Sequence, residues 1–238
     1  MNKTGIIGAM EIEVEGLKKE MQVCRTEEKA GMKFFEGTLC GQNVVVVRSG
    51  VGKVNAAVCT QILIDDFGVN LIINTGVAGS LKNEINIEDI VIATDVLHHD
   101  VDATLFGYKK GEVPQMGVHS FPADEKISEL AKEVSEQVNP EIKVFRGRIV
   151  SGDQFIFDKT IKAQIKNTFE GFCTEMEGAS IGHTAWLNRV PFVIIRAISD
   201  KADDSAKMDY PVFEAKAAAD SLRLVQGLMK RFSEDQKK

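Results

Sequence analysis

Short apolar runs alternate along this chain with amphipathic stretches. Runs rich in Val and Ile are typical of strands buried on both faces of a parallel sheet. Apolar residues spaced three and four apart indicate helices that pack by one face. Predicted strands are Thr4–Gly8, Lys33–Leu39, Asn43–Ser49, Asn70–Asn74, Asp89–Leu97, Lys143–Val150, Phe172–Met176 and Phe192–Ile195. Predicted helices are Ala9–Met21, Val54–Phe67, Asp124–Val138, Asp158–Phe169, Glu177–Leu187 and Pro211–Phe232.

This alternation predicts an α/β fold of three layers, with a central mixed β-sheet flanked by helices. The sheet is expected to be mixed because only Cys40-Gly41-Gln42 joins two of its strands, which favours an antiparallel pair. No internal repeat or low-complexity linker divides the 238 residues. A single domain over residues 1–238 is therefore expected, with 233–238 as a frayed tail.

Composition narrows the classes of function. The net charge of −6 and the low aromatic content argue against a nucleic-acid surface, although a nucleoside remains possible as a ligand. The four cysteines are scattered and form no CxxC or metal-like spacing. The first residues lack the apolar core of a signal peptide, and no apolar run is long enough to cross a membrane. A reduced, cytoplasmic setting is expected.

Polarity changes abruptly at the end of the last predicted strand. Arg196, Ser199 and Asp200 follow the apolar run within five residues. Ligands of open α/β sheets bind beyond the carboxyl ends of strands. A guanidinium, a hydroxyl and a carboxylate at such an end therefore indicate a site that binds a ligand and donates a proton to it. The alternative is a strand and a turn, with Asp200 capping the next helix.

Other predicted strand ends are similarly unusual. Glu11, Glu13 and Glu15 crowd the start of the first helix, where the helix dipole favours negative charge. That explanation leaves open why one glutamate would face inward. Glycine loops follow two further strands, at Gly50–Lys53 and Thr75–Ser80. The first loop lacks the third glycine of a dinucleotide fingerprint, so it is weak support for NAD.

Six such motifs occur in order along almost the whole chain: G-A-M-E-I-E, S-G-V-G-K, N-T-G-V-A-G-S, S-G-D-Q-F-I, T-E-M-E-G-A-S and R-A-I-S-D. Together they resemble the 5′-methylthioadenosine/S-adenosylhomocysteine nucleosidases of the purine nucleoside phosphorylase superfamily. The resemblance implies a nucleoside phosphorylase-like fold. It also implies a cofactor-free, metal-free homodimer that hydrolyses the N-glycosidic bond of adenine thionucleosides.

The resemblance also implies roles for individual residues. Asp200 would be the general acid at N7 of adenine, with its pKa raised by partial burial, and Ser199 would orient it. Glu13 would be the general base that activates water, and Arg196 would organise the polar site around that water. Glu177 would accept hydrogen bonds from the ribose hydroxyls and stabilise the developing positive charge.

The remaining matched positions concern binding. Phe155 would stack on adenine, the Ile156 backbone would read its edge, and Met176 would pack against ribose. Met10, Val51 and Tyr210 would line the pocket for the 5′-alkylthio group. Phe106 and Pro114, on the long segment Phe106–Ser120, would close the pocket of the partner subunit. Without the motifs, core packing explains Phe155, Met176 and Met10 equally well.

Two departures from the family pattern concern specificity. Val77 stands where many relatives have Ser, and Tyr210 stands where Phe is common. Neither change removes a proposed acid or base. Both could shift the preference among 5′ substituents.

Four alternatives remain open from the sequence. A nucleoside phosphorylase would use phosphate, which Glu13 would repel, although Arg48 and Lys53 are possible phosphate ligands. A 6-amino-6-deoxyfutalosine nucleosidase would share the adenine half of the substrate. A nucleoside-binding module without catalysis would not need Glu13, Glu177 and Asp200 together. A metallohydrolase around His98-His99-Asp100 is disfavoured, because a polar loop with hydrogen-bonded histidines is expected there.

Overall fold

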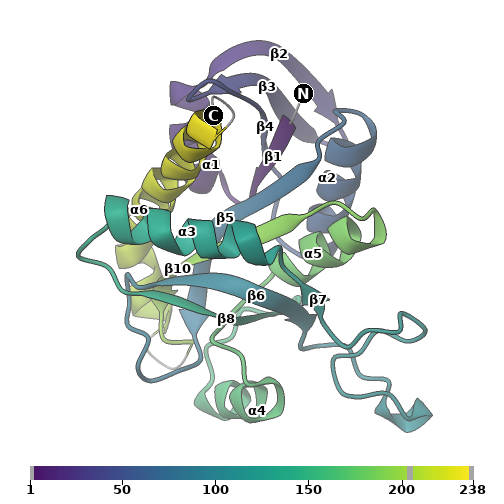
Figure 1. Cartoon of the computed structure of the whole chain (residues 1–238). Helices are drawn as coiled ribbons and strands as arrows, with labels where there is room; N and C mark the ends of the chain where they lie inside the picture. The colour runs from purple at the N-terminus through teal and green to yellow at the C-terminus, as the bar shows by residue number, and fades with distance from the viewer. Residues whose placement is uncertain (1–2, 203–205, 236–238) are drawn as a thin grey trace.

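The computed structural model describes residues 3–202 and 206–235, without the side chains of 206–211 and 235 (Figure 1). The strands are β1 (Lys3–Gly8), β2 (Gln22–Lys29), β3 (Met32–Leu39), β4 (Gln42–Arg48), β5 (Leu71–Ser80), β6 (Ile90–His98), β7 (Phe121–Pro122), β8 (Val144–Ser151), β9 (Cys173–Glu175) and β10 (Phe192–Asp200). The helices are α1 (Glu11–Glu20), α2 (Lys53–Asp65), a 3₁₀ turn η1 (Thr104–Phe106), α3 (Glu125–Val138), α4 (Lys159–Phe169), α5 (Gly178–Leu187) and α6 (Ala206–Asp235).

All of the described strands belong to one mixed sheet, as the sequence predicted. β1 lies parallel to β4 and β5, whereas β3 lies antiparallel to β4 and β2. β2, which the sequence pattern did not predict, forms the edge of this sheet. Its side chains are almost all exposed, so its sequence carries no apolar alternation.

Half of the sheet closes on itself. β10 pairs with both β5 and β6, β6 pairs with β8, β8 with β9, and β9 again with β5. This ring brings together the ends of strands that are far apart in the sequence.

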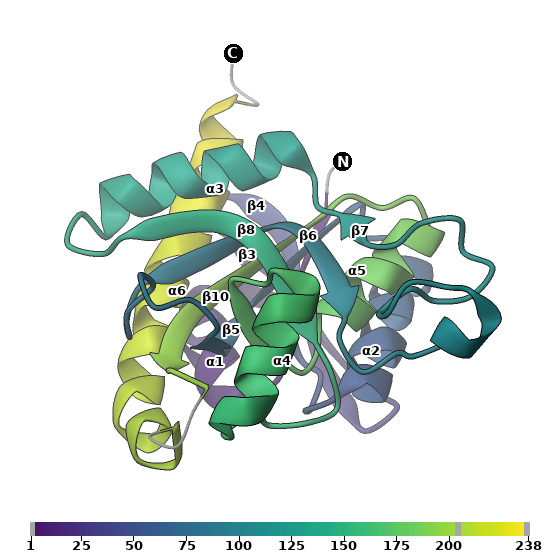
Figure 2. The same cartoon turned by 90° about the horizontal axis from the view of Figure 1, so that it is seen from below.

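The strands alternate their side chains between two apolar cores, one on each face of the sheet. Ile7, Val45 and Val47 pack in one core with α2 and α5, whereas Ile6, Val44 and Val46 pack in the other with α1, α3 and α6. Helices therefore cover both faces, which gives the three predicted layers (Figures 1 and 2). Among the described residues, no helix is both long and apolar enough to cross a bilayer.

Three predicted boundaries were wrong. β5 continues through Thr75–Ser80, and β10 continues through Arg196, Ser199 and Asp200, so both polar motifs belong to strands. Both strands are hydrogen-bonded to each other along these segments, which holds polar and glycine-rich sequence in an extended conformation. α6 begins at Ala206 although Pro211 was expected to start it.

Candidate active site

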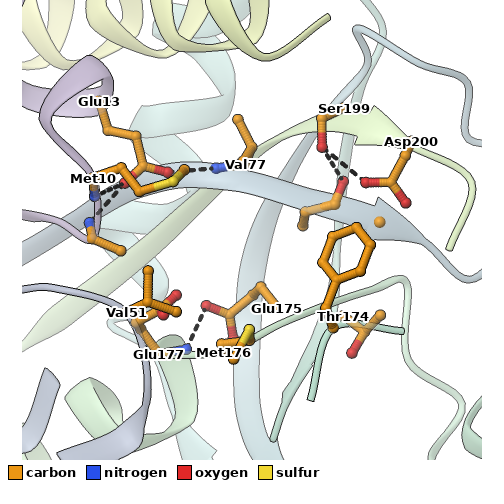
Figure 3. Close-up of a pocket in the computed structure, with 14 residues that line it drawn as sticks. Met10, Glu13, Val51, Val77, Thr174, Glu175, Met176, Glu177, Ser199 and Asp200 are labelled. Carbon is orange, nitrogen blue, oxygen red and sulfur yellow. Dashed lines mark hydrogen bonds between the residues drawn. The ribbon is translucent and has the colours of Figure 1, made fainter. Parts of the chain in front are cut away.

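A cavity of about 260 Å³ opens where β5, β9 and β10 end, beside the start of α1. The lining residues come from six segments of the chain, and Figure 3 shows them as sticks. They are Ala9, Met10, Glu13, Val51, Val77, Ala78, Gly79, Phe155, Thr174, Glu175, Met176, Glu177, Ser199 and Asp200.

Glu13 is the inward-facing glutamate of α1. Its Oε2 accepts hydrogen bonds from the Ala9 N–H at 2.6 Å and the Met10 N–H at 2.9 Å. Its Oε1 accepts one from the Val77 N–H at 3.2 Å. Glu11 and Glu15 face outward and pair with lysines of the same helix. Their lysine partners account for those two glutamates, whereas Glu13 is held in the cavity by three backbone donors.

Asp200 and Ser199 both reach the cavity because β10 is irregular there. The pairing of β10 with β5 shifts register between Ile198 and Asp200, so Ser199 is an extra residue, as in a β-bulge. Neighbouring side chains of a regular strand would point to opposite faces. The Ser199 hydroxyl donates to Asp200 Oδ2 at 3.0 Å, and the Ala202 N–H donates to Oδ1 at 2.7 Å. Asp200 is the last residue of β10, and α6 begins at Ala206.

Glu177 immediately precedes α5, at its N-cap position. Its Oε1 accepts a hydrogen bond from the Gly52 N–H at 2.8 Å, across the cavity from the β4–α2 loop. The side chain is almost completely buried. This carboxylate therefore depends on the position of a loop that is distant in sequence.

A buried ion pair lies behind the cavity wall. Arg196 is 1% exposed and donates to the Glu175 carboxylate and to the side-chain Oδ1 of Asn74. Glu175 also accepts from the Ser151 hydroxyl and from the Gly178 N–H at 2.8 Å. The positive charge of Arg196 is thus largely committed to Glu175.

The three glutamates differ in their affinity for a proton. Burial raises the pKa of Glu13, against the opposing effects of its backbone donors and Arg196. Burial and the negative charge of Glu175 raise the pKa of Glu177 to about 8. Burial alone would raise the pKa of Glu175, but Arg196 and the bonds from Ser151 and Gly178 hold it below its usual range. Separated pKa values among neighbouring carboxyl groups are typical of acid–base sites.

His98 and His99 are buried, and His98 belongs to a strand instead of the expected polar loop. One expected hydrogen bond is present, because His98 Nε2 lies 3.4 Å from His183 Nδ1. His98 ends β6, and its ring contacts Phe121 and His183. Within the described part of the chain, His98 Nδ1 and His99 Nε2 have no hydrogen-bond partner, and burial lowers the pKa of both rings. No group of three or more His, Cys, Asp or Glu side chains among the described residues could hold a metal ion.

Comparison with known proteins identifies the family. A model of the phosphorylase superfamily matches residues 3–230. A 5′-methylthioadenosine/S-adenosylhomocysteine nucleosidase from an Exiguobacterium species is 43% identical, covering 98% of this chain and 99% of that protein. The chain belongs to the 5′-methylthioadenosine/S-adenosylhomocysteine nucleosidases of the phosphorylase superfamily. Membership confirms the predicted resemblance and the enzyme class, an N-glycosyl hydrolase.

Solved structures of related enzymes agree with the fold. The nucleosidase of Neisseria meningitidis, in complex with methylthio-immucillin-A, superposes with a TM-score of 0.93 at 40% identity over 97% of this chain and 100% of that one. A futalosine hydrolase of Helicobacter pylori superposes with a TM-score of 0.91 at 32% identity over 97% and 98%. The predicted nucleoside phosphorylase-like fold is confirmed.

Most residues predicted from the nucleosidase motifs lie together in the cavity. Glu13, Glu177 and Asp200 all line it. So do the predicted binding residues Met10, Val51, Val77, Phe155, Met176 and Ser199.

The other five predicted residues are not among the described residues that line this cavity. Arg196 does not line the cavity and bonds to Glu175. The side chain of Ile156 packs in an apolar cluster with Ile165 and Phe169, and the expected contact of its backbone with adenine stays a prediction. Phe106 and Pro114 are exposed on the long loop and do not line the cavity of their own chain. The side chain of Tyr210 lies outside the described residues.

Sequence reasoning gave no role to Glu175 and Thr174. Both line the cavity, and Glu175 carries the ion pair with Arg196. The signal for Glu175 was the T-E-M-E motif, in which two carboxylates stand two residues apart. Only the fold shows that Arg196 reaches the first of them.

Proposed function

We propose that the chain hydrolyses the C1′–N9 bond of 5′-methylthioadenosine and S-adenosylhomocysteine, and also of 5′-deoxyadenosine, releasing adenine and the 5′-substituted ribose. This reaction would recycle by-products of S-adenosylmethionine and serve methionine salvage. The observation that carries the proposal is the convergence of Glu13, Glu177 and Asp200 on one cavity beside Phe155. A site that only binds nucleosides has no need of three carboxyl groups.

Asp200 serves as the acid and Glu13 as the base. Asp200 donates a proton or hydrogen bond to N7, so the pair of electrons of the breaking bond goes to a neutral leaving base. Glu13 takes a proton from water, whose oxygen forms the new bond to C1′. Glu177 binds the ribose hydroxyls and stabilises the oxocarbenium-like ring. Ser199 orients Asp200 through its 3.0 Å bond.

Water rather than phosphate is the nucleophile. Among the described residues, no lysine or arginine lines the cavity, and Arg196 is paired with Glu175. Lys53, a possible phosphate ligand, pairs instead with Asp100 at 2.7 Å. The carboxylate of Glu13 would repel phosphate from the position it needs.

The 5′ pocket favours an apolar substituent, because Met10, Val51 and Val77 contribute apolar side chains to the cavity. A futalosine-type substrate is the second candidate. It is supported by the similarity to the futalosine hydrolase, and it shares the adenine half. A direct competition between the two substrates decides the preference.

Assembly and location complete the proposal. A homodimer, in which Phe106 and Pro114 close the cavity of the partner subunit, is supported by their exposure on a long loop. A cytoplasmic location is supported by four unpaired cysteines, since thiols stay reduced there. One domain over the whole chain is supported by the continuous sheet.

Substitution of the two catalytic carboxyl groups tests the mechanism. In Glu13→Gln and Asp200→Asn we expect kcat to fall by about 10²–10⁴-fold, because each change removes one proton transfer. Binding of adenine should change little, since shape and hydrogen-bonding atoms are largely kept. Adenine release would be followed by chromatography, and adenine binding by calorimetry. An Asp200→Asn enzyme with wild-type turnover would contradict the assignment of the acid.

A further inference from the structure

The start of α2 and the loops after β6 and β8 are tied together by Lys53, Asp100 and Asp153. Lys53 Nζ donates to Asp100 Oδ1 at 2.7 Å, and the Asp153 N–H donates to Asp100 Oδ2 at 3.0 Å. The Lys53 N–H donates to Asp153 Oδ1 at 2.8 Å, which closes the ring of contacts. We call this set the latch. It joins the segments that follow β4, β6 and β8, and none of its members lines the cavity.

The ion pair of the latch is largely shielded from water. The side chains of Lys53 and Asp100 are 21% and 20% exposed. Burial alone would raise the pKa of Asp100, but Lys53 and the Asp153 N–H hold it below its usual range. Asp100 therefore remains an anion at neutral pH, and its attraction to Lys53 is less screened than that of a surface pair.

Each end of the latch adjoins a group of the active site. Gly52, which donates to Glu177 at 2.8 Å, directly precedes Lys53. Phe155, which lines the cavity, follows Asp153 by two residues. The His99 ring, next to Asp100 in sequence, packs closely on Gly152, which precedes Asp153. A Cβ added to Gly152 would lie 2.4 Å from that ring. A displacement of Lys53 or Asp153 would move the donor of Glu177 or the ring of Phe155.

We propose that Lys53 and Asp100 are positioning residues for the reaction, holding the Gly52 N–H against Glu177 and holding the Phe155 loop over the cavity. The inference rests on the proposed function, because it assigns Glu177 and Phe155 to ribose and adenine. Neither Lys53 nor Asp100 contacts the substrate in this account.

The latch has a consequence that a purely structural ion pair would not have. Glu177 faces Glu175 from β9, Arg196 from β10 and Glu13 from α1, and the Gly52 N–H is the neutral donor that lowers its pKa. Loss of the latch loosens this donor, so the pKa of Glu177 rises further. Since Glu177 acts as an anion, the acidic limb of kcat/KM then moves to higher pH.

The test compares Lys53→Met and Asp100→Asn, singly and together, with the full-length wild type. We expect each single variant to lose about 10- to 100-fold in kcat/KM, as misplaced catalytic groups do. The double variant should lose no more than the worse single variant, because both act through one contact. In all three, the acidic limb should move to higher pH. Melting temperatures measured alongside report any loss of stability.

Lys19→Met is the matched control, because Lys19 pairs with Glu15 on the exposed face of α1. It should keep wild-type kinetics and pH dependence. If Lys53→Met does not fold, the kcat/KM and the pH profile of Asp100→Asn alone test the proposal. An unchanged kcat/KM, or a loss of activity with a lower melting temperature and an unmoved acidic limb, overturns the proposal. Failure of the wild type and Lys19→Met to release adenine would instead overturn the proposed function.

Discussion

At the scale of single residues, Glu175 and Glu177 are two positions apart in sequence, but their pKa values shift in opposite directions. Glu175 is bonded to Arg196 and stays ionised. Its charge, together with burial, raises the pKa of Glu177 to about 8. The carboxylate of Glu175, paired with Arg196, therefore adds to the effect of burial on the pKa of a neighbouring carboxyl group.

The raised pKa values predict the acidic limb of the pH profile. Glu13 and Glu177 both act as anions, so activity is present above their pKa values and is lost as pH falls through them. We expect kcat/KM with 5′-methylthioadenosine to decline from near neutral pH, well above the ordinary glutamate value of 4.5. The measurement is kcat/KM from about pH 5 to about pH 9. A plateau that extends down to about pH 5 would contradict this assignment.

The sequence was sufficient to predict three carboxyl groups that share one cavity, but not to predict the residues around them. Glu13, Glu177 and Asp200 were predicted because each stands in a recognisable motif, and the structure places all three in one cavity. The resemblance gave Arg196 a role near the water but did not indicate its ion pair with Glu175, which is 21 residues away in sequence. Long-range contacts of this kind follow from the strand order, which a local pattern does not contain.

At the scale of elements, β5 passes close to α1 because Gly76 has no side chain. A Cβ at this position would lie 2.6 Å from Glu13 Oε1. Gly76→Ala should therefore displace the carboxylate of Glu13 and lower kcat by about 10²-fold, as a misplaced catalytic group does. The measurement is steady-state kinetics with 5′-methylthioadenosine.

Gly16→Ala, in α1, is the control for that substitution. Its Cβ would also approach another side chain at 2.6 Å, but that atom is the flexible end of Leu222. Alanine also favours the helix, by about 1 kcal/mol over glycine. We expect wild-type kcat for Gly16→Ala. Equal kcat values for the two variants would show that the approach of β5 to Glu13 is not needed.

Elements whose ends are marked by local sequence, such as a capping residue, were predicted well. Elements whose ends depend on pairing with a neighbouring strand were not. α3 and α4 begin where the sequence indicated, because Asp124 and Asp158 accept from backbone N–H groups of the first turn. The ends of β5 and β10 were predicted too early, because glycine and polar residues are usually turn signals. Here neighbouring strands override those signals, and the bulge at Ser199 depends on pairing with β5.

At the scale of the whole molecule, the proposed dimer follows from an exposed apolar surface. Leu105 and Phe106 on η1 are 90% and 78% exposed. Val54 on α2 and Leu187 on α5 are also exposed, and these two helices pack together. Figure 2 shows α2, α5 and the long loop on the same side of the molecule. Apolar side chains gathered this way are typical of a protein interface.

We expect sedimentation of the wild type to give a dimer. Phe106→Ser should raise KM for 5′-methylthioadenosine about 10-fold or more, because it removes an apolar contact to the 5′ substituent in the partner subunit. Val23→Ser, at an exposed apolar position on edge strand β2, should leave assembly and KM unchanged. A fully active monomer would contradict a shared cavity.

The most direct test of the central claim is product analysis with 5′-methylthioadenosine, with and without added phosphate. Hydrolysis by water that Glu13 activates predicts free adenine and 5-methylthioribose in equal amounts, at a rate that phosphate does not change. Formation of methylthioribose 1-phosphate only when phosphate is present would contradict the account, because phosphate would then occupy the place assigned to that water.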